Sequence, residues 1–182
     1  MPTDLLVRHC APTLAGMKVG NLVSHCFDDI KTFKNEIENK NKLLNLKGIF
    51  LVILKITDRS ALVYVYRKSQ LAQILNNKEI RKFLAENSYE NFEINDCLRT
   101  LKNHLQNKDF PHEIGVFLGY PLADIKAFIE NKGANFKIVG CWKSYFNEEE
   151  ASKTFERYKK CTKIYCAKLA EGFDITRLAV AV

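Results

Sequence analysis

Two β-rich stretches near the middle of the chain decide the fold: IFLVILKI at residues 49–56 and ALVYVY at residues 61–66. The four residues TDRS at 57–60 separate them, and loops of this length commonly close β-hairpins. Neither stretch alternates cleanly between apolar and polar residues, which predicts strands that are covered on both faces. We therefore expect an antiparallel hairpin in the interior of a sheet.

The segments around this hairpin have helical patterns. Residues 4–10 predict a short helix or strand that Pro12 ends, because proline lacks the backbone N–H group that a helix needs. Further helices are predicted at residues 27–47, 69–75, 78–87, 94–107 and 121–131. Gly133 is expected to follow the last of these as a helix stop.

The last third of the chain predicts alternating strands and helices. Short strands are expected at residues 113–118, 136–146 and 178–182. Asn147, with Glu150 three residues later, is typical of a helix N-terminus. In the helix that follows, positions 151, 155, 158, 162, 165 and 169 form a core-facing stripe, and Gly172 ends it.

Together these elements predict an α/β or α+β fold. Its sheet would be mixed, with four to six strands, and helices would pack on it. Right-handed crossovers would make the last three strands parallel. No linker or repeat divides the sequence, so one domain is expected over residues 1–182.

The composition is that of a globular cytoplasmic protein. Apolar residues make up 47% of the 182 residues and charged residues 27%. The longest apolar run, residues 49–54, is far too short to span a membrane, and the first residues do not resemble a signal peptide. The net charge is +7, but arginine is scarce beside lysine, so a nucleic-acid partner is not expected.

The six cysteines are expected to be reduced thiols with no metal bound. They are scattered along the chain and form no Cys-x-x-Cys pair, which disfavours both a zinc module and a disulfide framework. The cysteines are Cys10, Cys26, Cys97, Cys141, Cys161 and Cys166.

Several motifs resemble a family of proteins from anaerobic bacteria, clostridial or fusobacterial, that carries a domain-of-unknown-function label. They include HCAPTLAG from residue 9, HEIGVFLGYP from residue 112 and GCWKSY from residue 140. The resemblance covers nearly the whole chain. It implies a cytosolic bacterial protein, and it implies no particular reaction or cofactor.

A candidate ligand site comes from three junctions where a predicted strand leads into a helix. In sheets with parallel strands, ligands bind beyond the carboxyl ends of the strands. The N-termini of the helices and nearby cations would attract an anion there. The side chains at these junctions are Arg67, Lys68, Ser69, Tyr120 and Lys143.

Three more residues are expected at the rim of the same cleft: His9, Lys18 and His112. Lys18 ends the loop APTLAGMK at residues 11–18, which suggests a phosphate loop but lacks the Gly-x-x-x-x-Gly-Lys-Ser/Thr pattern. His9 belongs to LLVRH, which is similar to the start of the histidine phosphatases, with Cys10 in the place of their glycine. Either segment can equally be structural.

Two functions follow as alternatives. In the first, the protein binds a small anionic ligand or cofactor at the strand ends, either as an enzyme or as a binding protein. In the second, it is an interaction module whose basic last helix docks on an acidic protein, such as an electron-transfer protein, or on nucleic acid. The basic residues of that helix are Lys153, Arg157, Lys159, Lys160, Lys163 and Lys168.

Overall fold

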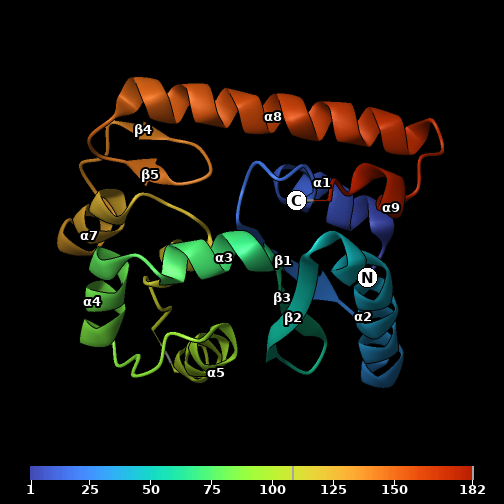
Figure 1. The fold of residues 1–182 in the computed structure, drawn as a ribbon, viewed down its shortest axis with the longest axis horizontal. Coiled ribbons are helices and arrows are strands. Elements are labelled where there is room, and N and C mark those ends of the chain that lie inside the picture. Colours follow the sequence, from blue (N-terminus) through green and yellow to red (C-terminus); the bar gives the residue numbers. More distant parts are fainter. Residues whose placement is uncertain (108, 182) are drawn as a thin grey trace.

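The computed structural model describes residues 1–107 and 109–181 and has an α+β fold (Figure 1). The strands are β1 (Gly20–Cys26), β2 (Ile49–Ile56), β3 (Ser60–Arg67), β4 (Ile138–Val139) and β5 (Lys143–Ser144). The first helices are α1 (Thr3–Leu14), α2 (Ile30–Leu44), the 3₁₀ turn η1 (Asn45–Lys47), α3 (Lys68–Leu75), α4 (Lys78–Glu86) and α5 (Ile94–His104). They are followed by α6 (Ile114–Phe117), α7 (Leu122–Glu130), α8 (Glu148–Ala170) and α9 (Ile175–Leu178).

The predicted hairpin forms the heart of a three-stranded antiparallel sheet with the strand order β1-β3-β2. Val63 in the central strand pairs with Val23 on one side and with Ile53 on the other. The antiparallel pairing of the hairpin is therefore confirmed. Among the described residues, only β3 is interior by strand order, because β2 pairs with β3 alone and lies at the edge.

Both faces of β3 are covered because its side chains alternate between two apolar cores. Val63 and Val65 pack into one core with α1, α2 and α9, while Tyr64 and Tyr66 pack into the other with α3 to α7. Tyr64 is fully buried, and its hydroxyl donates a hydrogen bond to the carbonyl of Phe117. This two-sided burial explains why the strand reads as a continuous apolar run.

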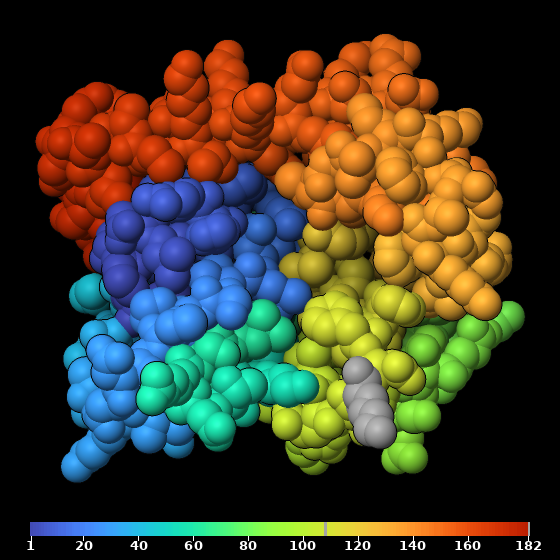
Figure 2. Space-filling view, turned by 180° about the vertical axis from the view of Figure 1, so that it is seen from behind, coloured from blue at the N-terminus to red at the C-terminus, as the bar shows by residue number. Residues whose placement is uncertain are grey.

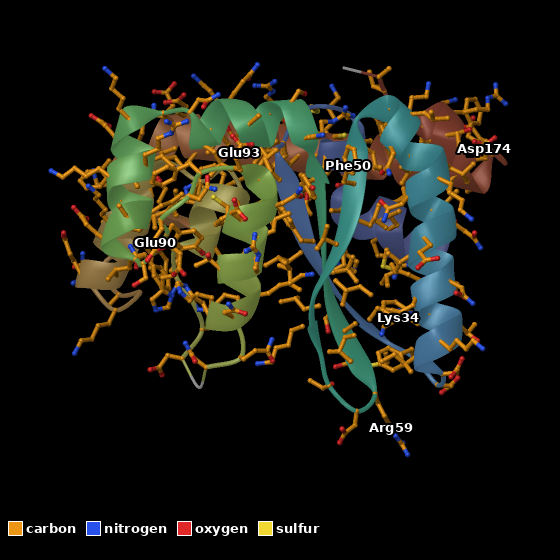
Figure 3. All side chains as sticks on the ribbon, turned by 60° about the horizontal axis from the view of Figure 1, so that its bottom comes forward. Lys34, Phe50, Arg59, Glu90, Glu93 and Asp174 are labelled. Carbon is orange, nitrogen blue, oxygen red and sulfur yellow. The ribbon has the colours of Figure 1, made fainter. Side chains whose placement is uncertain are left out.

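The helices form one layer on each side of the sheet, and α8 crosses both (Figure 1). This helix packs along α1 and reaches β4 at its first turns. Seen from behind, the first and last parts of the chain lie against one another (Figure 2). The hairpin tip, which carries Arg59, projects away from both helical layers (Figure 3). In the part of the chain that the structure describes, no helix is both long and apolar enough to cross a membrane.

The predicted parallel strands of the last third are wrong. Residues 114–117 form the short helix α6, and residues 136–146 fold into the small antiparallel pair β4-β5. Leu178 ends the short helix α9 and packs in the core with Ala179, and Val180 N donates to Leu14 O at 3.0 Å, so the described part of the predicted strand at 178–182 is not a strand. Short buried apolar runs do not distinguish strand from helix, and here the surrounding core decided the outcome.

The first segment also differs from its prediction, because α1 continues through Pro12 to Leu14. A proline in the last turn removes only the bond to the carbonyl of residue 8, and Arg8 is exposed to water. Asn147 does precede α8 as predicted, yet its side chain does not cap the helix. Its Nδ2 instead donates to Glu150 Oε2 at 2.6 Å.

The side chain of Arg67, the last residue of β3, is buried and holds several distant segments together. Its guanidinium donates to the carbonyls of Thr13 at 2.6 Å and Leu14 at 2.5 Å, which end α1, and to that of Val180 at 2.9 Å. The last carbonyls of a helix have no partner within the helix, and they lie at the negative end of its dipole. Burial lowers the pKa of Arg67, but an arginine keeps its charge in proteins.

We predict that Arg67→Met lowers the free energy of unfolding by about 3 kcal/mol, because the buried carbonyls of Thr13 and Leu14 and the partly exposed carbonyl of Val180 lose a charged donor. Urea denaturation followed by circular dichroism measures this loss. Arg67→Lys should recover only part of it, since an ammonium cannot reproduce the planar fork of donors.

The neighbouring exposed residue provides the matched control. Lys68→Met should change stability by less than about 0.5 kcal/mol. Equal effects at the two positions would contradict the structural role of Arg67.

Candidate functional site

The structure divides the predicted site residues among several places, and they do not line one cleft. The cleft required β3 and the last strands to be parallel, whereas β3 is antiparallel to its neighbours and residues 114–117 are helical. The eight residues are Arg67, Lys68, Ser69, Tyr120, Lys143, His9, Lys18 and His112.

Four of the eight lie away from the others. Arg67 is 1% exposed and is bound to backbone carbonyls, as described above. Lys68 and Ser69 are exposed at the start of α3, where they line a shallow hollow with Phe50. His9 is exposed on α1 and lines neither this hollow nor the two pockets described below, which involve the other four residues.

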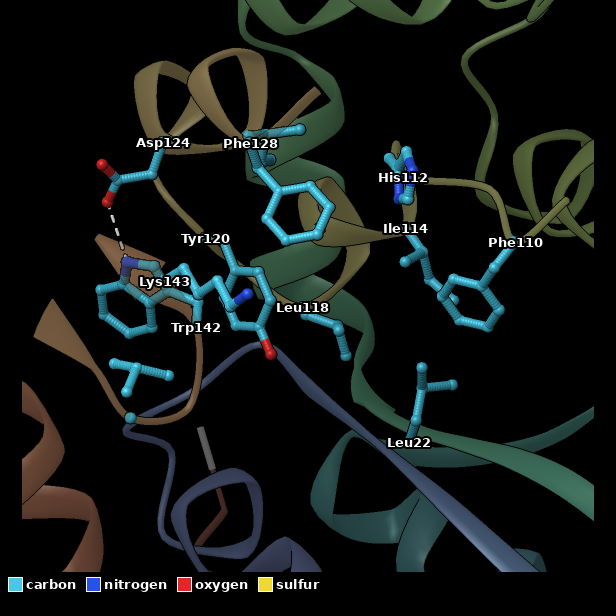
Figure 4. A pocket seen from close by; sticks show the side chains of 14 residues that line it. Leu22, Phe110, His112, Ile114, Leu118, Tyr120, Asp124, Phe128, Trp142 and Lys143 are labelled. Atoms are coloured by element: carbon cyan, nitrogen blue, oxygen red, sulfur yellow. Dashed lines mark hydrogen bonds between the residues drawn. The ribbon is translucent and has the colours of Figure 1, made fainter. Parts of the chain in front are cut away.

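Three of the predicted residues, His112, Tyr120 and Lys143, meet in one hollow of about 420 Å³, which we call the aromatic pocket (Figure 4). Its walls come from β1, α6, α7 and the β4-β5 hairpin. Beside the three predicted residues, its lining consists of Leu22, Phe110, Ile114, Gly115, Leu118, Asp124, Ile125, Phe128, Val139, Gly140 and Trp142.

The rings of the aromatic pocket are held in place by contacts with one another and with the backbone. The ring centroids of Tyr120 and Trp142 lie 5.4 Å apart. Those of His112 and Phe128 lie 5.1 Å apart, in an edge-to-face arrangement. The hydroxyl of Tyr120 donates to the carbonyl of Cys141 at 2.7 Å. The turn before α7 is thereby tied to the β4-β5 hairpin, so the opposite walls are linked.

The single carboxylate of this lining is already engaged. Asp124, on the first turn of α7, is buried and accepts hydrogen bonds from Trp142 Nε1 and from the backbone N of Tyr145, both 2.8 Å long. Figure 4 shows the bond to Trp142. Both carboxylate oxygens of Asp124 therefore already accept hydrogen bonds from the protein. The basic side chains of the lining that remain to meet a ligand are His112 and Lys143.

Lys143 lies over apolar rings and can offer further hydrogen bonds. Its Nζ donates to the carbonyl of Gly133 at 2.8 Å and lies 4.8 Å from the ring centroid of Phe136 and 5.7 Å from that of Phe128. An ammonium carries three donors, so one bond to a carbonyl leaves two for a ligand. Rings and ammonium together suit a planar group that bears a negative charge.

Lys18 lines a third hollow, of about 490 Å³, which we call the Lys18 pocket. It is bordered by the loop after α1, by α3 and α4, and by α8. Lys18 Nζ lies 5.3 Å from the ring centroid of Tyr120. Gly119 lines the same hollow at φ +72°, and a Cβ there would come within 2.7 Å of Val19, so the turn requires glycine.

The sequence reasoning missed Asp124 and Trp142 as site residues. It placed Trp142 inside a strand and gave Asp124 no role, because an acid in the first turn of a helix is ordinary dipole chemistry. The one available signal for Trp142 was its place in the GCWKSY motif. Nothing in the sequence connects it to a carboxylate 18 residues earlier.

A buried polar cluster was also missed. Glu113 is 5% exposed, lies 2.6 Å from His104 Nδ1 through its Oε1, and accepts a bond from the hydroxyl of Tyr89 at 3.3 Å. Burial raises the pKa of Tyr89 above its usual range, and Glu113 adds to this. The cluster lines neither the aromatic pocket nor the Lys18 pocket, so its contacts are those of a satisfied core network.

The family described as "Protein of unknown function (DUF3793)" matches residues 6–179, and the chain therefore belongs to this family. This confirms the resemblance to a family with a domain-of-unknown-function label, while the anaerobic source stays a prediction. Neither the curated proteins nor the solved structures contain a match to the chain.

The six cysteines are free thiols that differ widely in exposure. Cys26 and Cys141 are exposed, and Cys166 is intermediate. The other three, Cys10, Cys97 and Cys161, are buried, and burial raises the pKa of each, that of Cys97 to about 11. Within residues 1–107 and 109–181, no group of three His, Cys, Asp or Glu side chains is placed to hold a metal ion.

We predict two rapid thiol reactions in the native protein, at Cys26 and Cys141, because only the exposed thiolate attacks a disulfide reagent readily. Ellman's reagent with stopped-flow detection, followed by peptide mass spectrometry, assigns each phase. The three buried thiols should react only as urea unfolds the chain. Rapid modification of Cys10 in the folded protein would contradict this structure.

Proposed function

We propose that the protein binds a small, planar and largely apolar ligand with one anionic group in the aromatic pocket. The observation that carries the proposal is the combination of ring-lined walls with one carboxylate that is already bonded. Apolar walls with a few placed polar groups are typical of small-molecule sites. His112 and Lys143, which border this pocket, would then meet the anionic group.

The rings would supply most of the affinity and the cations the selectivity. Tyr120, Phe128 and Trp142 offer faces and edges on which a planar ligand can stack. Lys143 would bind a carboxylate or phosphate through the two donors that Gly133 leaves unused. Asp124 would hold the indole of Trp142 in position and would not touch the ligand.

The proposal concerns binding and does not specify a reaction. The ligand can be a cofactor or a substrate. No reaction is assigned, because the lining contains no thiol and its one hydroxyl, that of Tyr120, is already bonded to the backbone. The ligand class is the small anionic one expected from the sequence. The predicted site, however, is reduced to the three residues that share this pocket.

Trp142 is the only tryptophan of the chain, so its fluorescence reports on this pocket alone. We expect 4-nitrobenzoate to quench it with saturation, and the neutral 4-nitrobenzamide to bind roughly tenfold more weakly, because a charged hydrogen bond contributes about 1.5–3 kcal/mol. Lys143→Met should remove the difference between the two probes. The matched control is Lys137→Met on the same hairpin, which should preserve it.

A second variant tests the shape of the pocket independently of charge. Leu22→Phe adds a ring from β1 and should weaken both probes alike, since it fills part of the 420 Å³. Equal affinity for 4-nitrobenzoate and 4-nitrobenzamide in the unaltered protein would contradict the anionic part of the proposal. Quenching that never saturates would contradict binding altogether.

The alternative function, docking of α8 on an acidic protein, stays a second proposal because of one observation. Lys153 and Lys168 pair with Glu149 and Glu171, whereas the exposed basic residues between them form no ion pair in the described parts of the chain. These residues are Arg157, Lys159, Lys160 and Lys163. A run of unneutralised charge on a surface helix can attract an acidic partner.

This docking can be tested with salt and with charge removal. Binding of an acidic protein such as a flavodoxin, measured by surface plasmon resonance, should weaken steeply between 50 and 200 mM salt, on the order of tenfold or more. Neutralising Lys153, Arg157 and Lys160 should abolish it without changing the melting temperature. Binding that ignores both changes would remove the electrostatic docking proposal.

A further inference from the structure

Lys18 combines burial with the lack of a counter-ion. Its residue is only 6% exposed, and the described residues provide its Nζ with neither a hydrogen bond nor an ion pair. The ring of Tyr120, 5.3 Å away, is the group that faces it. A buried ammonium without a partner is strongly disfavoured, and the side chain responds by giving up its proton more readily.

The backbone around Lys18 is fixed, so its amine is held in one place. The N–H groups of Met17 and Lys18 donate to the carbonyl of Pro12 at 2.8 and 3.1 Å, which continues the last turn of α1. The hydroxyl of Tyr158 on α8 donates to the carbonyl of Met17 at 3.3 Å. Gln70 Nε2 on α3 donates to the carbonyl of Gly16 at 2.8 Å.

The Lys18 pocket differs in its chemistry from the aromatic pocket. Its wall from α3 and α4 carries the amide side chains of Gln70, Gln73 and Asn77. Gln70 donates to Gly16 and Asn77 Oδ1 accepts from the first N–H groups of α4, which leaves the oxygen of Gln70, the amino group of Asn77 and the whole amide of Gln73 for a ligand. The lining contains no carboxylate. The pocket is therefore suited to a small polar molecule, which its amide groups would orient toward Lys18.

The titratable groups near Lys18 leave its amine weakly basic. Burial lowers the pKa of Lys18, and the thiols of Cys141 and Cys10 offset this only in part. Tyr120 and Tyr158 complete the surroundings, and burial raises the pKa of both, so they are neutral at pH 7. More of the nucleophilic amine is then present at neutral pH than on an ordinary lysine.

We infer that Lys18 is a reactive amine that condenses with the carbonyl group of a small polar aldehyde or ketone held in the Lys18 pocket. The Nζ lone pair attacks the carbonyl carbon, and the carbonyl oxygen takes up a proton from nitrogen to give a carbinolamine. Loss of one water then forms the C=N bond of the imine. The step needs no oxidant or reductant, and it does not rest on ligand binding in the aromatic pocket.

Reductive trapping of the whole chain tests the inference, with glyoxylate as the probe and sodium cyanoborohydride as the trapping reductant. Peptide mass spectrometry should find Lys18 modified several-fold faster than the exposed Lys68 at pH 7, because a lowered pKa leaves a larger fraction of the amine neutral. This advantage should shrink as the pH approaches 10.5, the ordinary lysine value, where about half of an ordinary lysine's amine is already neutral. Equal or slower modification of Lys18 in the folded protein overturns the inference.

A stability measurement provides the second, independent readout. Lys18→Met removes the buried amine while keeping its apolar stem, so the melting temperature should rise by about 2–4 °C for each kcal/mol gained. It should also become less dependent on pH. A lower melting temperature would show that the amine makes a stabilising contact, and the inference would fail.

Discussion

A buried guanidinium, which forms no ion pair with any carboxylate of residues 1–107 and 109–181, organises this structure. Arg67 lies at the end of the central strand and binds the last carbonyls of α1 and the carbonyl of Val180. A charge in a protein interior is tolerated only when its donors are satisfied, so the three segments must meet at one point. The position of α1 relative to the sheet follows from this meeting, and α8 packs along α1 in turn.

The two candidate pockets depend on the same arrangement through the Gly119–Tyr120 turn. Tyr120 lines the aromatic pocket, while Lys18, four residues after the end of α1, lies over its ring. Gly119 borders the Lys18 pocket and packs against Val19. A shift of the loop after α1 would therefore change both hollows together, which makes this loop and turn the structural link between them.

The helices α2 to α5, α7 and the long α8, together with the antiparallel hairpin, could be predicted from local patterns of apolar residues, whereas the segment of α1 fitted a helix or a strand equally well. Residues 113–118 and 136–146 could not, because short apolar runs fit a buried helix, a strand or a loop, and only the surrounding core decides among them. The error carried over to the site, since parallel strands were the reason for joining Arg67 to Lys143. Tyr120, His112 and Lys143 still meet, but through the contact of α6 and α7 with the β4-β5 hairpin. Long-range pairs such as Asp124 and Trp142 leave no local trace in a single sequence.

The bond from Arg67 to Val180 also bears on how the protein is made. The two residues are 113 positions apart, and α8, which packs on α1, lies between them in the sequence and is synthesised before Val180. A nascent chain released only as far as β3 has an arginine whose final acceptor does not yet exist. The strands can pair early, but Arg67 lacks its hydrogen bond to Val180 until residue 180 leaves the ribosome. Completion of the fold is thus a late event, governed by the slow closure of long-range contacts.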